Sequence, residues 1–432
     1  MAIQGEIDLV NEFVGEVEDR VVWEYDKIRF APAQEKRARI SRGLFYAGYG
    51  LWIIWKFTSI TVLSFPEGSA VHTILHALVL LLLLISILAN PPKMGVCALS
   101  GISLAVSLLV MKQSGQSILL DLTMILVSST GCRYRTIARY TLILVGFLSV
   151  ATVVASQLGL IVDYPFSRGG TIRHGLGFRY STYLSHLYLN LVLVYLYLRK
   201  NHLAWWEYVL ICVIDVYIFV MTDSRNSFGL VLFVLAASLA IRVWRGSKHM
   251  QRLVSWGAKS GFILVFAVGS LAAIAYDSAS PVWKSMNSFT SNRLSQEHAS
   301  LLKYGIKPFG QEIELVGNSL IMGDSLEINK EANQKADRNV IENSLIKVGV
   351  QYGAAPLVMV LAALFCAAIR ASRSDDLIMS LTLLVFAAHS YFDPQLMDLL
   401  YTTIWFYAWA AVVQCVAPWL NNRVARVMVG LN

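Results

Sequence analysis

The sequence has little charge. Only 15% of its 432 residues are charged, whereas 56% are hydrophobic and the mean hydropathy is +0.56. Because a soluble domain carries about 25% charged residues, a single soluble globule is excluded. Cysteine is also scarce: the five cysteines form no CxxC pair and show no Cys/His spacing, so we expect neither a disulfide framework nor a metal site.

Long apolar runs occupy more than half of the chain. Twelve stretches are each about 18 residues or longer, which is the length that crosses the hydrocarbon core of a bilayer as a helix. The sequence therefore predicts an all-α polytopic membrane protein with about twelve transmembrane helices. The predicted spans are 43–65, 70–89, 93–111, 115–131, 138–161, 180–198, 203–222, 226–243, 259–277, 341–369, 375–391 and 394–418.

The basic residues predict the orientation. Of the 36 Lys and Arg, 22 lie in one alternating set of connections, whereas the short loops of the other set hold only 5. The positive-inside rule then places both termini in the cytoplasm, so the formal charge of +8 reflects topology rather than a nucleic-acid partner. The predicted parts are an amphipathic cytoplasmic tail (1–42), nine spans (43–277), a long external loop (278–340), three spans (341–418) and a cytoplasmic C-terminal tail (419–432).

One short external loop is rich in arginine. Arg168, Arg173 and Arg179 fall within twelve residues, with His174 and several glycines between them, on the side where short loops usually lack basic residues. The planar guanidinium suits bidentate capture of phosphate, and glycine lets a backbone approach an anion closely. Pairing with nearby acids or lipid headgroups is the alternative.

A polar stripe follows this loop. Tyr180, Tyr183, His186 and Asn190 recur at steps of three or four along the outer half of the sixth span. Such a stripe does not face lipid, so it either lines a wet cavity or makes hydrogen bonds between helices.

Arg225 lies in the external turn directly before the eighth span. The free amides of a helix N-terminus together with a guanidinium form a plausible anion site. Alternatively, Asp223 or Ser224 simply caps the helix.

The long loop also carries candidate residues. Arg293 and Glu297 are predicted to pair at i,i+4 spacing, and His298 shares another face with several leucines, which predicts a short helix. A turn over 307–310 follows. Loops of about 60 residues in compact proteins are usually functional.

The tenth span opens with Glu342. Asn343, Lys347 and Gln351 share one face, which favours an internal cavity that opens outward, and 349–353 has GxxxG spacing. In the first helical turn, Glu342 would be kept ionised by the helix dipole, so it either accepts a proton from a hydroxyl or only stabilises the dipole.

The order of these elements over roughly residues 165–410 resembles the superfamily of O-antigen and capsule repeat-unit polymerases (Wzy type) and O-antigen ligases (WaaL type). The family pattern Arg-x-x-Gly-x-Phe aligns with 173–178 if one residue is inserted, and its Ser-Arg element matches Ser224-Arg225. Its loop arginine with a downstream turn is similar to Arg293 with 307–310. Its Asp-Asn-Ser-Tyr-Leu is similar to 342–345, with Glu in place of Asp and no tyrosine.

The resemblance implies a GT-C-like bundle in a bacterial inner or plasma membrane. Its reaction joins polyprenyl-diphosphate-linked oligosaccharides into O-antigen, capsular polysaccharide or exopolysaccharide on the external face, without a metal or other cofactor. A flippase and a chain-length regulator are implied partners, besides the lipid bilayer. The implied base is Glu342, with His298 second, and the implied diphosphate and substrate contacts are Arg173, His174, Arg179, Tyr183, Arg225, Arg293 and Asn343.

Two alternatives remain. The ligase branch commonly has a histidine where this chain has Asn343, which favours a polymerase, although His298 can serve a related role. A lipid-linked oligosaccharide flippase or other transporter would also have many spans and a polar cavity. Transporters usually contain internal repeats and polar sites near the midplane, whereas this sequence lacks repeats and its informative arginines gather at the predicted external surface.

Overall fold

The protein is described by a computed structural model that covers residues 32–63, 69–200, 202–244, 246–315 and 340–429. In these ranges it is helical apart from one two-stranded sheet. The first elements are α2 (Pro32–Ser59), α3 (Ala70–Ala89), α4 (Met94–Ser114), α5 (Ile118–Ser128), α6 (Tyr134–Gln157), β1 (Phe166–Arg168), β2 (Thr171–Arg173), α7 (Tyr183–Arg199), α8 (Trp205–Thr222) and α9 (Arg225–Val243). They are followed by α10 (Lys248–Ala275), α11 (Pro281–Phe289), α12 (Arg293–Tyr304), α14 (Ser344–Lys347), η2 (Val348–Tyr352), α15 (Ala354–Arg373), α16 (Leu377–Phe392) and α17 (Ile404–Val429).

Seven of the described helices are long and apolar enough to cross a membrane, namely α3, α4, α6, α8, α9, α10 and α15. Their outer faces are apolar: on α6, Ile143, Phe147 and Val150 are 64–69% exposed at helical spacing. A surface of this kind suits hydrocarbon rather than water. The chain therefore has the character of a multi-pass membrane protein in a lipid bilayer.

The predicted spans overlap helices, but their number stays a prediction. The apolar helix α5 and the helix α16 are shorter than a full span. Helix α2 begins at Pro32, ten residues before the predicted end of the N-terminal tail, and residues 1–31 of that tail lie outside the described residues. The predicted helix in the long loop is confirmed as α12, whereas residues 316–339 of the same loop lie outside the described residues.

Two predicted continuous spans are wrong in detail. The segment 341–369 is broken into α14, the π-helix η2 and α15, and helix α17 begins only at Ile404 rather than near 394. The break has a local cause, because Gly353 adopts φ +105 and the turn 307–310 docks onto it. Ala354 N donates to the Lys307 carbonyl at 2.8 Å, and Ala355 N donates to the Pro308 carbonyl at 3.0 Å. The glycines of the 349–353 GxxxG spacing therefore pack against the loop rather than against a neighbouring span.

Substitution of Gly353 tests this docking. A Cβ at Gly353 would lie 2.3 Å from the Gly310 nitrogen and 2.6 Å from the Pro308 oxygen, in a left-handed backbone conformation. We expect Gly353→Ala to destabilise the protein by about 3–4 kcal/mol, because backbone overlap adds to the left-handed cost. Gly305→Ala is the control, since Gly305 has φ +61 but no atom within 4 Å of its would-be Cβ. Its thermal midpoint in detergent should fall less, and equal losses would contradict the docking.

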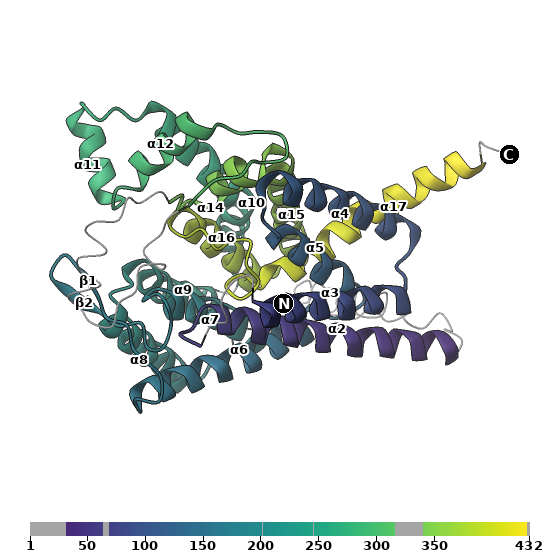
Figure 1. Ribbon diagram of the computed structural model, residues 1–432, viewed down its shortest axis with the longest axis horizontal. Coiled ribbons are helices and arrows are strands. Elements are labelled where there is room, and N and C mark those ends of the chain that lie inside the picture. The colour runs from purple at the N-terminus through teal and green to yellow at the C-terminus, as the bar shows by residue number, and fades with distance from the viewer. Residues whose placement is uncertain (1–31, 64–68, 201, 245, 316–339, 430–432) are drawn as a thin grey trace, which may run out of the picture.

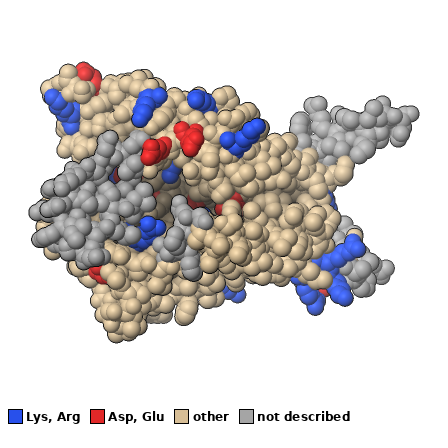
Figure 2. Space-filling view, viewed as in Figure 1, with Lys and Arg blue, Asp and Glu red and all other residues tan. Residues whose placement is uncertain are grey.

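Elements that carry or adjoin the predicted site residues lie at one end of the molecule. Figure 1 shows the hairpin β1–β2 and helix α11 at the end opposite to the one where α17 terminates. The surface seen in Figure 2 is hollowed between the part that contains α11 and α12 and the part that contains β1, β2 and α8. Acidic and basic side chains both lie in and around this hollow.

Candidate functional site

An ion pair joins the long loop to the start of α14. The Arg293 guanidinium at the first turn of α12 contacts the Glu342 carboxylate, and their side chains are 18% and 34% exposed. The predicted i,i+4 pairing of Arg293 with Glu297 is therefore wrong, because Glu297 turns into the protein and is fully buried. Glu342 also lies before the helix rather than in its first turn, since Asn343 is the N-cap and α14 begins at Ser344.

A second group of polar side chains comes from α7 and the end of α16. His186 Nδ1 lies 2.6 Å from the Asp393 carboxylate and 3.1 Å from Gln395 Oε1. The His389 ring packs edge-on against His186, with centroids 5.0 Å apart. We call His186, His389 and Asp393 the His–Asp cluster; the side chains of its three members are 3–11% exposed.

The ion pair and the His–Asp cluster form one site. Arg293 Nη2 donates to the Phe392 carbonyl at 3.4 Å, directly before Asp393. The Ser344 hydroxyl donates to the Asp393 carbonyl and also accepts from Leu396 N at 3.2 Å, so the start of α14 is tied to the segment that carries the cluster.

The chemistry of the cluster follows from its hydrogen bonds. Asp393 and Gln395 both offer oxygen acceptors to His186 Nδ1, so this nitrogen carries the proton and Nε2 keeps its lone pair. A carboxylate that orients a histidine in this way prepares it to accept a proton from a hydroxyl. The three side chains can also hold a metal ion, because their ligating atoms lie within 4.8 Å of one another.

The arginine-rich loop packs against the α8–α9 junction. Arg173 is 4% exposed, and its Nε donates to the Thr222 carbonyl at 2.7 Å. His174 N donates to the Met221 carbonyl at 2.8 Å, and His174 Nδ1 lies 2.7 Å from the Asp163 carboxylate. The structure thus brings together two motifs that lie about 50 residues apart in the sequence, and Arg173 holds the junction in place.

Arg225 is exposed, whereas Arg179 is half-buried. The Arg225 side chain is 79% exposed, and its Nε lies 3.0 Å from the Asp223 carboxylate. Ser224 is the N-cap of α9 but makes no side-chain capping bond, so Asp223 holds the arginine instead of the helix end. Arg179 is fixed by its backbone N, which donates to the Ile60 carbonyl at 3.0 Å, while its buried Nε has no hydrogen-bond partner among the described residues.

A row of aromatic rings runs from the hairpin to the His–Asp cluster. Phe166 contacts Tyr180, Tyr180 contacts Tyr183, and each pair of centroids is 5.8 Å apart. Tyr183 then contacts Tyr401 at 6.2 Å, and Tyr401 contacts His186 at 6.4 Å. The polar stripe predicted on α7 therefore has two roles: its outer part lines this row, whereas Asn190 bonds to Thr403 and the Leu400 carbonyl.

Two other predicted residues have structural contacts. His298 Nδ1 lies 2.8 Å from the Ala273 carbonyl, and its ring contacts Tyr276, so its contacts among the described residues are with the end of α10. The Asn343 side chain accepts from Leu345 N and Ile346 N and thereby caps α14. Asn343 fixes the direction of the helix that follows Glu342.

Glu297 makes the stability of this end of the molecule sensitive to pH. Burial raises the pKa of its carboxyl to about 8; the charge of Arg293 lowers it, and Glu342 raises it further. The unfolded value is about 4.3, so between these values the folded state binds the extra proton and its stability falls as pH rises. We expect the thermal midpoint of the protein to decrease from pH 5 to pH 9, by the equivalent of a few kcal/mol. Glu297→Gln should flatten this dependence, and an unchanged slope would contradict it.

The sequence pattern does not point to the cluster as a unit. It places His186 in the polar stripe and gives no role to His389 or Asp393. His389 lies inside an apolar run and Asp393 occupies the short connection after it, more than 200 residues from His186. The available local signal is that two titratable residues, His389 and Asp393, lie just before and within the predicted external connection between the last two spans.

No protein-family model, curated protein sequence or solved structure matches this chain.

Proposed function

We propose that the protein is a membrane glycosyltransferase that joins polyprenyl-diphosphate-linked oligosaccharide repeat units into a polysaccharide on the external face of a bacterial inner or plasma membrane. The observation that carries the proposal is the contact of Arg293 and Glu342 beside the His186–Asp393 hydrogen bond. A fixed cation and a prepared base at one site are what transfer from a diphosphate donor to a hydroxyl acceptor requires.

In the proposed reaction, His186 Nε2 accepts the proton of an acceptor sugar hydroxyl. The hydroxyl oxygen forms a bond to the anomeric carbon of the donor glycan as the bond from that carbon to the carrier diphosphate breaks. The lipid diphosphate leaves with the bonding electrons, and Arg293 stabilises its growing negative charge. Asp393 holds the imidazole in the required tautomer and stabilises the imidazolium that forms.

The base role assigned to Glu342 from sequence moves to His186 in this proposal. The Glu342 carboxylate is already engaged by the Arg293 guanidinium, whereas His186 is oriented by Asp393 for proton transfer. Glu342 instead holds Arg293 in position until the diphosphate arrives. Arg225 lies on the exposed side of the hairpin region, where it is suited to the first contact with an anionic substrate.

A ligase that transfers glycan to a lipid A core is the second candidate. It is favoured by one observation: two histidines, His186 and His389, lie next to the start of α14, where the ligase branch commonly places one. Both functions use the same donor and differ in the acceptor.

The test is reconstitution of the purified protein in liposomes with a defined lipid-linked repeat unit. A ladder of polymer lengths without any added acceptor supports the polymerase. Products that appear only when a lipid A core is added support the ligase. Transfer of labelled substrate between leaflets without a new glycosidic bond would overturn both and support the transporter.

A further inference from the structure

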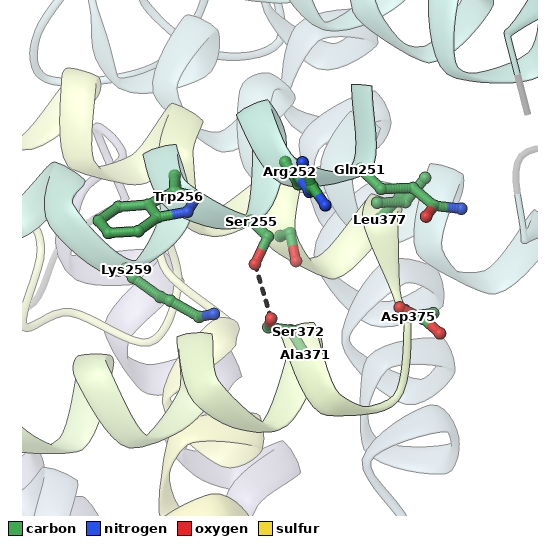
Figure 3. Close-up of a pocket in the computed structure, with 10 residues that line it drawn as sticks. Gln251, Arg252, Ser255, Trp256, Lys259, Ala371, Ser372, Asp375 and Leu377 are labelled. Carbon is green, nitrogen blue, oxygen red and sulfur yellow. Dashed lines mark hydrogen bonds between the residues drawn. The ribbon is translucent and has the colours of Figure 1, made fainter. Parts of the chain in front are cut away.

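A pocket lies at the other end of α10 from the candidate site. It has a volume of about 250 Å³ and is formed by the first turns of α10 and the turn between α15 and α16. Figure 3 shows the side chains around this space, including Arg252 and Lys259 from α10 and Asp375 from the opposite turn. Ser255 and Ser372 join the two sides with a hydrogen bond of 2.6 Å.

The charges of this pocket are not neutralised within the described residues. Arg252, Lys259 and Asp375 all line it, yet no ion pair involves any of them in the part of the chain that the structure describes. The Ser380 side chain also lines the pocket, is 1% exposed, and leaves its hydroxyl without a hydrogen-bond partner there. Because buried polar groups are normally satisfied, the Ser380 hydroxyl indicates a polar ligand. The more exposed Arg252, Lys259 and Asp375 set the charges that this ligand meets.

The surroundings indicate that this ligand comes from a membrane. Trp256 is 71% exposed at the pocket and Leu253 beside it is 70% exposed. Tryptophan and basic side chains gather at the headgroup level of bilayers. On the same face of α10 as Trp256 and Lys259, the helix continues with exposed Ile263 and Ile274, which offer an apolar track for an acyl chain.

We infer that the pocket binds the headgroup of a phospholipid that carries both a phosphate and a primary ammonium. Arg252 and Lys259 provide cations for the phosphate, as basic pockets between transmembrane helices commonly do. The Asp375 carboxylate on the opposite side offers hydrogen-bond acceptors that match an ammonium but repel a purely anionic headgroup. The inference does not depend on the proposed catalytic function.

Native mass spectrometry of the full chain in detergent tests the inference. Phosphatidylethanolamine, phosphatidylglycerol and phosphatidylcholine are titrated separately, and inorganic phosphate is added as a competitor. We expect phosphatidylethanolamine to bind at least severalfold more tightly than the other two. Equal affinities for all three lipids, or displacement by millimolar phosphate alone, would overturn the assignment to a lipid headgroup.

Variants locate the site. Arg252→Gln combined with Lys259→Gln should weaken phosphatidylethanolamine binding by about tenfold or more, because two phosphate contacts are lost. Asp375→Asn should shift the preference from phosphatidylethanolamine towards phosphatidylglycerol. Lys248→Gln is the matched control, since Lys248 is exposed on the same helix but does not line the pocket. Undiminished binding by the double variant, or an unchanged preference in Asp375→Asn, would contradict the inference.

Discussion

Replacing His186 with glutamine should lower the rate of polymer formation by about 100- to 10,000-fold, while the protein still inserts and purifies normally. His186 accepts the hydroxyl proton in the proposed reaction, and glutamine retains a similar volume and a hydrogen-bonding end without a titratable nitrogen. Initial rates with a lipid-linked repeat unit measure the loss. His249→Ala is the control, because His249 is exposed at the far end of α10.

Variants of the residues that contact His186, together with a chelator, distinguish a general base from a metal ligand at this position. Asp393→Asn should also cause a large loss, because an amide no longer selects the tautomer that leaves Nε2 free. His389→Ala should cost less, since the His389 contact with His186 is a ring contact. If a chelator abolished activity and an added divalent ion restored it, the three residues would be metal ligands and the base assignment would fail.

The sequence predicted helices more reliably than it predicted their interruptions. Span 70–89 coincides with α3, because an uninterrupted apolar run leaves no other solution in a bilayer. The break at Gly353 could not be predicted, since it depends on the turn 307–310 docking from a distant segment. A GxxxG spacing alone does not reveal whether a helix or a loop fills the groove.

The site was predictable only in part for the same reason. Arg293 stood out because its loop is unusually long and the family pattern has an arginine in that loop, and α12 followed from its periodicity. The partner of Arg293 was not predictable, because helical spacing favoured Glu297 and only tertiary packing brings in Glu342. The His186–Asp393 contact joins a residue of the sixth span to a residue in the short connection after the eleventh, more than 200 residues away, so no local pattern points to it.

Replacing Arg293 with alanine should reduce kcat by about 100- to 1000-fold, because a preorganised cation that stabilises a developing charge contributes on this scale. Arg293→Lys should retain part of the activity, since the charge remains while the planar fork is lost. Lys303→Ala on the same helix is the control, because Lys303 is exposed and its Nζ lies over the neighbouring Tyr304 ring.

A double variant distinguishes a role towards the substrate from a role within the protein. If Arg293 only neutralises Glu342, then Glu342→Gln should restore activity to Arg293→Ala, because no unpaired carboxylate remains. If Arg293 stabilises the leaving diphosphate, the double variant should stay as inactive as Arg293→Ala, while Glu342→Gln alone should lose less. We expect the second pattern, since a guanidinium that is partly exposed beside the His–Asp cluster is accessible to a substrate anion. Full rescue by Glu342→Gln would remove Arg293 from the reaction and leave it as a structural partner of α14.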